Sequence, residues 1–211
     1  MNDEQRRRRI AVLISGRGSN LQSIIDAIHR GRLQAEIGLV LSNREGAQGL
    51  TRAQQAGIPT SCLSHRDYSS RDAYDRALAE VLTRHEIDLV CLAGFMRLIG
   101  KPLLEAFPDR ILNIHPSLLP AFPGLEAQRQ ALDHGVKVSG ATVHLVNDQL
   151  DAGPIVLQAA VPVLPDDSVE TLSARILVEE HRIYPEAVAM VLSGHWHLVG
   201  RRFVAEASGA I

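Results

Sequence analysis

Two residues suited to acyl chemistry stand two positions apart near the middle of the sequence, in Leu112–Ser117. If this segment is a strand, Asn113 and His115 project to the same side of it. An amide N–H can polarise a carbonyl and stabilise its oxyanion, while an imidazole can carry the proton. The pair therefore predicts acyl transfer. The alternative is that His115 is a structural histidine near a sheet edge.

A carboxylate partner for this histidine is available in the later loop Asn147–Pro154. Asp148 or Asp151 could fold over the sheet edge, orient the imidazole and stabilise its charged form. The spacing alone does not choose between them, and a polar turn with two solvated acids remains the other interpretation.

A covalent route is not favoured, because no convincing nucleophile accompanies the pair. Ser117 is near but lacks the G-x-S-x-G elbow of serine hydrolases. Neither Cys62 nor Cys91 has an evident histidine partner in the sequence. We therefore expect a substrate amine to attack a bound acyl donor directly.

A glycine-rich loop, Ser15–Asn20, follows the apolar run Ile10–Ile14 and precedes a helical pattern. Backbone N–H groups at such a strand-to-helix turn can receive an anion. The dinucleotide fingerprint requires a third glycine where Leu21 stands, and the second strand ends in Ser42-Asn43-Arg44 rather than in an acid. A phosphate monoester fits better than NAD or a nucleoside triphosphate. An ordinary strand-to-helix turn is the alternative.

The elements that position these residues alternate in type along the chain. We expect strands at 10–14, 37–41, 60–63, 88–93, 111–114, 141–146, 155–163 and 197–204, and helices at 21–29, 47–56 and 71–84. Asp167 with Glu170 forms a capping-box signature before a last helix that ends near Leu192, with a kink or break at Tyr184-Pro185. The alternation predicts an α/β, Rossmann-like open sheet, mainly parallel, with helices on both faces and mixed C-terminal strands.

The composition indicates one continuous domain over residues 1–211, with a flexible arm at 1–9 and halves at 10–115 and 116–211. A net charge of −2 argues against a nucleic-acid surface, and no apolar run is long enough to span a membrane. The arginines at 6–9 are expected to be solvated. Cys62 and Cys91 lie in apolar runs, which favours buried free thiols and a cytoplasmic location. His195 and His197 lack a third ligand, so we expect no metal site.

Four motifs in order resemble those of the glycinamide ribonucleotide formyltransferases, a branch of the formyltransferase family. The resemblance covers about Ile10 to Leu192 and rests on the segments Ile14–Gln22, Leu92–Arg97, Asn113–Pro120 and Leu150–Ile155. The wider family shares the Asn-x-His-Pro-Ser segment and the later Asp. The Gly-x-Gly-Ser-Asn loop, Gly16–Asn20, indicates the ribonucleotide branch.

This resemblance implies transfer of a formyl group from 10-formyltetrahydrofolate, a co-substrate rather than a tightly bound cofactor, to the amine of glycinamide ribonucleotide in purine synthesis. The first half would bind the phosphate and the second the folate. Asn113 would donate to the formyl oxygen, His115 would stabilise the oxyanion and move the proton, and Asp151 would orient His115. Carried over by position, the other expected contacts are Gly18, Ser19 and Asn20 with the phosphate, Glu180 with the ribose, Arg71, Met96, Arg97, Leu98, Ile99 and Asn113 with the folate, the loop 147–151 with its pteridine, and His144 in support.

Three rival functions remain open. A formyltetrahydrofolate hydrolase would use the same side chains with water as acceptor, but such enzymes usually carry an extra N-terminal domain, and only nine residues precede the first expected strand. A methionyl-tRNA formyltransferase would need a C-terminal domain and a basic surface. A non-catalytic binder of a phosphorylated metabolite is the third. As partners we expect small molecules only, with the chain a monomer or a homodimer.

Overall fold

The computed structural model describes residues 7–206, and the chain divides after Leu112 into two compact units. The first unit ends with Leu112 and the second begins with Asn113. The strand β5 (Ile111–His115) carries the chain from one to the other.

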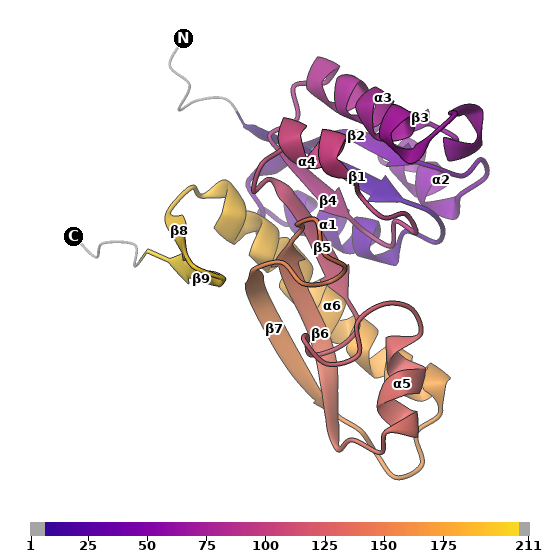
Figure 1. Ribbon diagram of the computed structural model, residues 1–211, viewed down its shortest axis with the longest axis vertical. Helices are drawn as coiled ribbons and strands as arrows, with labels where there is room; N and C mark the ends of the chain where they lie inside the picture. Colours follow the sequence, from indigo (N-terminus) through magenta and orange to yellow (C-terminus); the bar gives the residue numbers. More distant parts are fainter. Residues whose placement is uncertain (1–6, 207–211) are drawn as a thin grey trace. The chain divides into compact units, whose positions relative to one another are not determined.

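The first unit is a parallel sheet with a helix after nearly every strand (Figure 1). Its strands lie in the order β3-β2-β1-β4, and the pairs β1–β2, β1–β4 and β2–β3 are all parallel. Its elements before β5 are β1 (Arg8–Ile14), α1 (Ser19–His29), β2 (Ala35–Ser42), α2 (Gln48–Gln55), β3 (Thr60–Cys62), the 3₁₀ helix η2 (His65–Asp67), α3 (Arg71–Arg84), β4 (Leu89–Leu92) and α4 (Lys101–Ala106).

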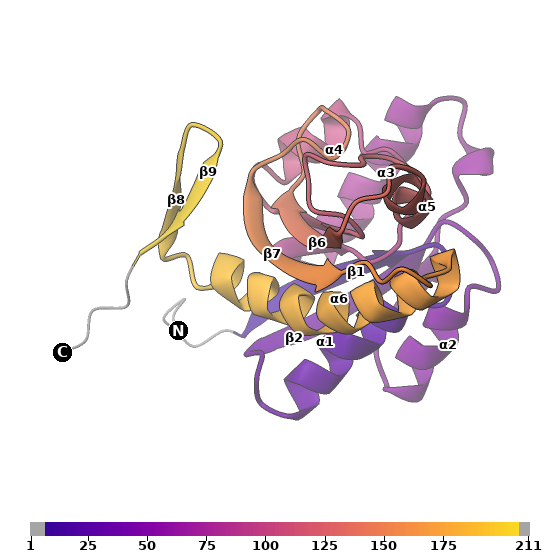
Figure 2. The same cartoon turned by 90° about the horizontal axis from the view of Figure 1, so that it is seen from below.

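Helices cover both faces of this sheet, with α1 and α2 on one side and α3 and α4 on the other (Figure 2). The central strand β1 is apolar and fully buried from Ile10 to Ile14, as a strand covered on both faces should be. The strand order reverses direction beyond β1, so right-handed crossovers place α1 and α2 opposite α3. This confirms the expected fold class for the first half of the chain.

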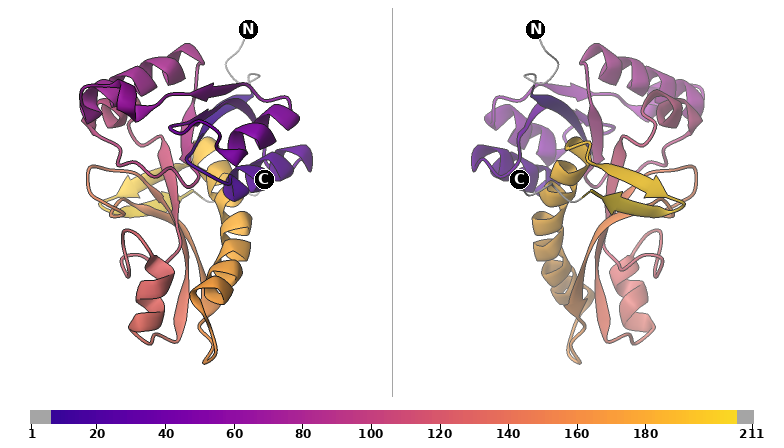
Figure 3. Two further views of the ribbon diagram at one scale, coloured as in Figure 1. Left: turned by 90° about the vertical axis from the view of Figure 1, so that its right-hand side faces the viewer. Right: turned by 90° about the vertical axis from the view of Figure 1, so that its left-hand side faces the viewer.

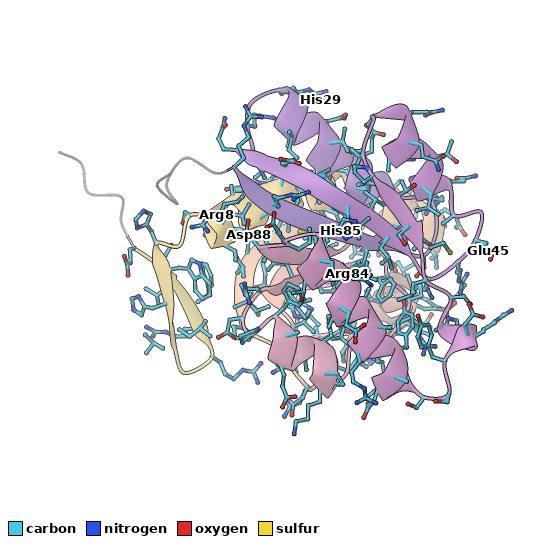
Figure 4. The ribbon with its side chains drawn as sticks, turned by 90° about the horizontal axis from the view of Figure 1, so that it is seen from above. Arg8, His29, Glu45, Arg84, His85 and Asp88 are labelled. Carbon is cyan, nitrogen blue, oxygen red and sulfur yellow. The ribbon has the colours of Figure 1, made fainter. Side chains whose placement is uncertain are left out.

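The first strand begins at Arg8, two residues before its expected start. The Arg9 backbone N–H donates to Asp88 Oδ2 at 2.7 Å, and its guanidinium lies against Gly38, where a Cβ would be 3.0 Å from Nε. An Arg8 guanidinium nitrogen lies 4.0 Å from Asp88 Oδ1, and Figure 4 shows the two side chains together. Arg8 and Arg9 therefore belong to the sheet rather than to an arm. Residues 1–6 of the expected arm lie outside the described residues.

The second unit is a mixed sheet with one long helix against it. Its strands follow the order β5-β6-β7-β9-β8; β6 pairs with β7 and β8 with β9 in antiparallel fashion, while β7 and β9 are parallel. The long helix α6 packs against β6 and β7 (Figure 2). The elements are α5 (Ala127–Asp133), β6 (Val138–Leu145), β7 (Ile155–Pro162), α6 (Val169–Leu192), β8 (Trp196–Val199) and β9 (Arg202–Ala205).

The start of α6 differs from its expected capping. The capping box is formed by Ser168 and Thr171, not by Asp167 and Glu170. Asp167 instead forms an ion pair with Arg175, in the second turn of the helix, at 2.7 Å. A hydroxyl at the N-cap satisfies a free backbone N–H of the first turn, and this leaves the neighbouring carboxylate available for the arginine.

Two expectations for the C-terminal region are wrong in detail. The helix α6 continues through Pro185 without a break, because the residues around the proline are buried and packing holds the helix. The single strand expected at 197–204 is a hairpin, since Gly200, with φ +61°, allows a tight turn between β8 and β9.

The two cysteines are both free, but only Cys91 is buried. The expectation was wrong for Cys62, because the short strand β3 forms the outer edge of its sheet and leaves that residue exposed. The short helices α4 and α5 were not expected from the sequence. Within residues 7–206, no helix is both long and apolar enough to cross a membrane.

Candidate active site

The imidazole of His115 lies between two oxygen acceptors at the end of β5. Its Nδ1 is 3.4 Å from Asp151 Oδ2, and its Nε2 is 2.9 Å from the carbonyl oxygen of Phe122. His115 is 5% exposed and the Asp151 side chain 10%. A carbonyl oxygen only accepts, so the hydrogen bond to Phe122 requires a proton on Nε2, and the Asp151 carboxylate lies on the Nδ1 side of the ring. Asp151 thus fixes the ring, and Nε2 is the nitrogen that can serve a substrate.

The carboxylate of Asp151 is itself held by the backbone of a neighbouring loop. Gly124 N–H donates to Asp151 Oδ2 at 2.8 Å. Asp151 has φ +48°, a left-handed conformation that is unfavourable for a residue with a side chain. Asp148, the other candidate partner, is exposed. The structure therefore places Asp151, and not Asp148, against the histidine.

The amide of Asn113 makes a hydrogen bond to a second buried histidine. Asn113 Nδ2 lies 3.2 Å from His144 Nε2, and His144 Nδ1 lies 2.9 Å from the carbonyl oxygen of Leu145. His144 Nε2 is also 3.8 Å from Asp151 Oδ1. Burial lowers the pKa of His144, despite the opposing effects of the Leu145 carbonyl and the Asp151 carboxylate. Asn113, His115, His144 and Asp151 thus form one connected group within the second unit.

Side chains of β6 and β7 hold the loop after β5 by hydrogen bonds. The Thr142 hydroxyl donates to the Ser117 carbonyl at 2.7 Å and accepts the Leu119 N–H at 3.0 Å. The Gln158 amide reaches both Thr142 Oγ1 and the Leu119 carbonyl at 2.9 Å. These bonds fix the chain that presents the Phe122 carbonyl to His115.

Gly49, which the sequence analysis did not single out, shapes the glycine-rich loop of the first unit. Gly18, the N-cap of α1, has φ +72°, and a Cβ on it would lie 2.7 Å from Gly49 Cα. Gly49 N–H donates to the Gly16 carbonyl at 3.0 Å, and Arg52 Nε donates to the Arg17 carbonyl at 2.9 Å. Because the N-cap Gly18 has no side chain, no side chain of that residue shields the N-terminus of α1, where the helix dipole favours an anion.

The buried hydroxyl of Ser15 connects the ends of three strands. Ser15 Oγ donates to Asn43 Oδ1 at 2.6 Å, just after β2, and accepts the Met96 N–H at 2.8 Å, after β4. The Ser15 N–H donates to the Gly94 carbonyl at 3.1 Å. The predicted phosphate loop and the start of the predicted folate segment are thereby joined within the first unit.

The far end of the segment 96–100 is attached to α3. Gly100 N–H donates to the buried Asp75 carboxylate at 2.6 Å, and a Cβ on Gly100 would lie 3.2 Å from Arg71 Nε. Burial raises the pKa of Asp75. Between these anchors Met96 and Leu98 are 58% and 55% exposed. Two apolar side chains held outward on a fixed segment offer a surface for a flat ligand.

The remaining expected residues lie as follows. Ser19 is half-buried and Asn20 buried at the start of α1, Arg71 is exposed at the start of α3, Arg97 is half-buried and Ile99 buried, and Glu180 is buried on α6. Among the described residues, no group of three or more His, Cys, Asp or Glu side chains is placed to hold a metal ion. Sequence reasoning missed Gly49, Asp75, Phe122 and Gly124, and the contacts of Ser15 within the predicted loop, since these roles depend on contacts distant in the chain.

The formyl transferase family model matches residues 8–188, which is most of the chain. The chain belongs to the formyl transferase family. Asn113, His115, His144 and Asp151 all lie within the matched residues. This confirms the resemblance stated from the four motifs.

Similar proteins of this family have the same fold and comparable length. The chain is 47% identical over 185 residues to "Phosphoribosylglycinamide formyltransferase" of Escherichia coli, covering 88% of this chain and 87% of that one. It is similar to the crystal structure of glycinamide ribonucleotide transformylase 1 from Symbiobacterium toebii, with 58% identity, a TM-score of 0.92, and coverage of 94% and 93%. The likeness confirms the expected Rossmann-like class.

Longer relatives contain the family region as one part. The chain is 51% identical over 192 residues to "Trifunctional purine biosynthetic protein adenosine-3" of Drosophila melanogaster. This match covers 90% of the chain but only 14% of that protein. The chain thus spans about a seventh of that relative.

Proposed function

We propose that this protein transfers the formyl group of 10-formyltetrahydrofolate to the amine of glycinamide ribonucleotide, in purine synthesis. The observation that carries the proposal is the connected group Asn113, His144, His115 and Asp151, with an amide and an imidazole on one strand. Membership of the formyl transferase family and the names of the relatives in Escherichia coli and Symbiobacterium toebii support the choice of donor and acceptor.

The proposed reaction is direct attack of the substrate amine on the formyl carbon. A new C–N bond forms, and the carbonyl electrons move to oxygen to give a tetrahedral intermediate. Asn113 Nδ2–H and His115 Nε2–H donate to this oxyanion. The bond to N10 of the folate then breaks, and the proton lost by the amine is transferred to N10 with the help of His115. Donor, acceptor and proton balance, with tetrahydrofolate and the formylated amine as products.

His115 must exchange its partner for this step. Its Nε2 is bonded to the Phe122 carbonyl, while Nδ1 faces Asp151. When substrate binds, Nε2–H donates to the developing oxyanion instead of to the Phe122 carbonyl, and Asp151 keeps the ring in place.

Substrate contacts are proposed by position in the family motifs. Gly18, Ser19 and Asn20 hold the ribonucleotide phosphate through the uncapped first turn of α1. Glu180 binds the ribose hydroxyls. The folate contacts are Arg71, Met96, Arg97, Leu98, Ile99 and Asn113, with the loop 147–151 on the pteridine. The exposed apolar surface of Met96 and Leu98 supports this assignment. We further propose a cytoplasmic location and a monomer or homodimer.

One assay separates this function from its rivals. Conversion of a 10-formyl folate is followed by absorbance, with and without glycinamide ribonucleotide. We expect turnover only when the ribonucleotide is present. Turnover in its absence would make water the acceptor and the protein a hydrolase. No turnover in either case would leave a binding protein or a different amine.

A further inference from the structure

The C-terminal hairpin β8–β9 reaches back to the loop that carries Asp151. Arg202, the first residue of β9, pairs with Ile155, the first residue of β7. At the tip of the hairpin, Arg201 Nη2 donates to the carbonyl oxygen of Ala152 at 2.7 Å. Figure 3 shows the hairpin in yellow beside β7. Ala152 directly follows Asp151, so the arginine bonds to the peptide next to the carboxylate that faces His115.

Contacts other than the hydrogen bond of Arg201 hold the C-terminal side of the Asp151 loop in place. Pro154 accepts the Leu145 N–H at 2.9 Å. A Cβ on Gly153 would overlap the Leu145 carbonyl oxygen, so only glycine fits there. Asp151 itself has φ +48°, a conformation that persists only when its surroundings impose it. The peptide between Asp151 and Gly153 is the part that Arg201 holds.

The conformation of the hairpin that carries Arg201 is itself fixed by several contacts. Its two-residue turn has Gly200 at the first position, with φ +61°, as tight hairpin turns of the II′ kind require. Trp196 and Phe203 stack across the hairpin at 4.8 Å between ring centroids. Trp196 Nε1 donates to the Val191 carbonyl at 2.9 Å, which ties the hairpin to the end of α6.

The contact of Arg201 is discrete rather than part of general packing. A hollow of about 680 Å³ is lined by Gly153, Ile155 and residues 201–205. Arg201 therefore meets the catalytic loop at the edge of an open space, through its hydrogen bond to Ala152. The neighbouring Arg202 is also exposed, and the hydrogen bond to Ala152 belongs to Arg201. The two arginines form a natural comparison.

We propose that Arg201 is a positioning residue: its bond to the Ala152 carbonyl holds Asp151 in the conformation that faces His115. The proposal rests on the proposed formyl transfer, in which Asp151 orients His115. Arg201 contacts no reacting atom. Its removal lets the peptide after Asp151 relax, and the carboxylate then spends less time opposite Nδ1 of His115.

The test compares Arg201→Gln with the matched control Arg202→Gln. We expect Arg201→Gln to lower kcat roughly 3- to 10-fold, because a small misplacement of a catalytic group slows the reaction. It should leave the KM for the ribonucleotide unchanged, so that the loss appears in kcat alone. Arg201→Lys, which keeps a donor, should recover part of the loss. Equal kcat for the two Gln variants would overturn the proposal.

Two further readouts separate positioning from a loss of folding or of function. In an Asp151→Asn background, Arg201→Gln should lower kcat no further, since its effect passes through Asp151; a fully additive loss would contradict the proposal. The NMR resonances of the His115 ring at fixed pH should change in Arg201→Gln and stay as in the wild type in Arg202→Gln. This readout requires no turnover, so it tests Arg201 even if the wild type proves inactive with the ribonucleotide. Unchanged resonances in both variants would refute the positioning role.

Discussion

Nδ2 of Asn113 donates a hydrogen bond to Nε2 of His144 across 3.2 Å, and this contact decides which way the Asn113 amide points. His144 Nδ1 faces the Leu145 carbonyl at 2.9 Å, so Nδ1 carries the ring proton and Nε2 accepts. Burial lowers the pKa of His144, which keeps the ring neutral near pH 7. The second hydrogen on Asn113 Nδ2 is then left for the formyl oxygen in the proposed reaction.

Loss of His144 should therefore reduce the rate rather than the affinity. We expect His144→Ala to lower kcat by about tenfold, since Asn113 is then free to rotate and the oxyanion loses a fixed donor. Steady-state kinetics checks this, with His29→Ala in the exposed last turn of α1 as control. A kcat equal to that of the control would show that Asn113 needs no such support.

The same histidine should make stability depend on pH. The unfolded chain protonates His144 near its ordinary pKa of 6.5, whereas the folded chain resists the proton to lower pH. Since the unfolded state then binds more protons, the free energy of unfolding should fall as pH drops through 6.5. Urea titrations near neutral and mildly acidic pH would measure this. His144→Gln should show a smaller fall than the wild type, and an equal fall would assign the effect to other groups.

The two residues on β5 should each matter chiefly for the chemical step. His115→Ala should lower kcat roughly 10²- to 10⁴-fold and Asn113→Ala roughly 10²- to 10³-fold, with smaller changes in substrate affinity. Kinetics paired with ligand binding by calorimetry separates the two effects. Retained binding without turnover would also exclude a non-catalytic binder. An unchanged kcat for either variant would contradict the mechanism.

The choice of Asp151 over Asp148 can be tested by the loss of rate. Asp151→Asn replaces the carboxylate that faces His115 Nδ1 and should lower kcat roughly 10- to 100-fold, because the imidazole loses the group that holds its orientation. Asp148→Asn, on the exposed part of the same loop, should leave kcat as it is. If instead only Asp148→Asn lowered kcat, the partner would have to be reassigned.

The glycine loop offers a test of the proposed phosphate site. Gly18→Ala meets two obstacles, a left-handed φ and a contact of 2.7 Å with Gly49 Cα, whereas Gly31→Ala meets only the left-handed φ of +69°. We expect Gly18→Ala to raise the KM for the ribonucleotide at least tenfold, and Gly31→Ala to lower stability by about 1 kcal/mol without changing that KM. Equal KM values in both variants would remove Gly18 from the phosphate site.

Local patterns were enough to find the elements that bear the chemistry. The buried run at β1, the glycine turn and the Asn-x-His spacing each follow from short-range rules of burial and side-chain direction. The resemblance to formyltransferases then distinguished Asp151 from Asp148, which spacing alone left open.

The supporting contacts could not be read in this way, because they join residues far apart in the chain. Ser15 meets Met96, 81 positions later, and Asp75 meets Gly100, 25 positions later. The hairpin was missed because the turn that divides the expected strand depends on the backbone conformation of one residue, Gly200. The kink or break expected at Pro185 is absent, because burial of its neighbours outweighs the backbone hydrogen bond that proline cannot donate.

The Ser15 hydroxyl limits how this protein can be redesigned. It uses its donor on Asn43 and an acceptor on Met96, and it is only 6% exposed, so alanine would leave both partners unsatisfied and threonine would add a methyl group where little space remains. Libraries aimed at new formyl donors should therefore keep position 15 constant and vary the exposed positions 96 and 98, whose side chains can change without disturbing the scaffold.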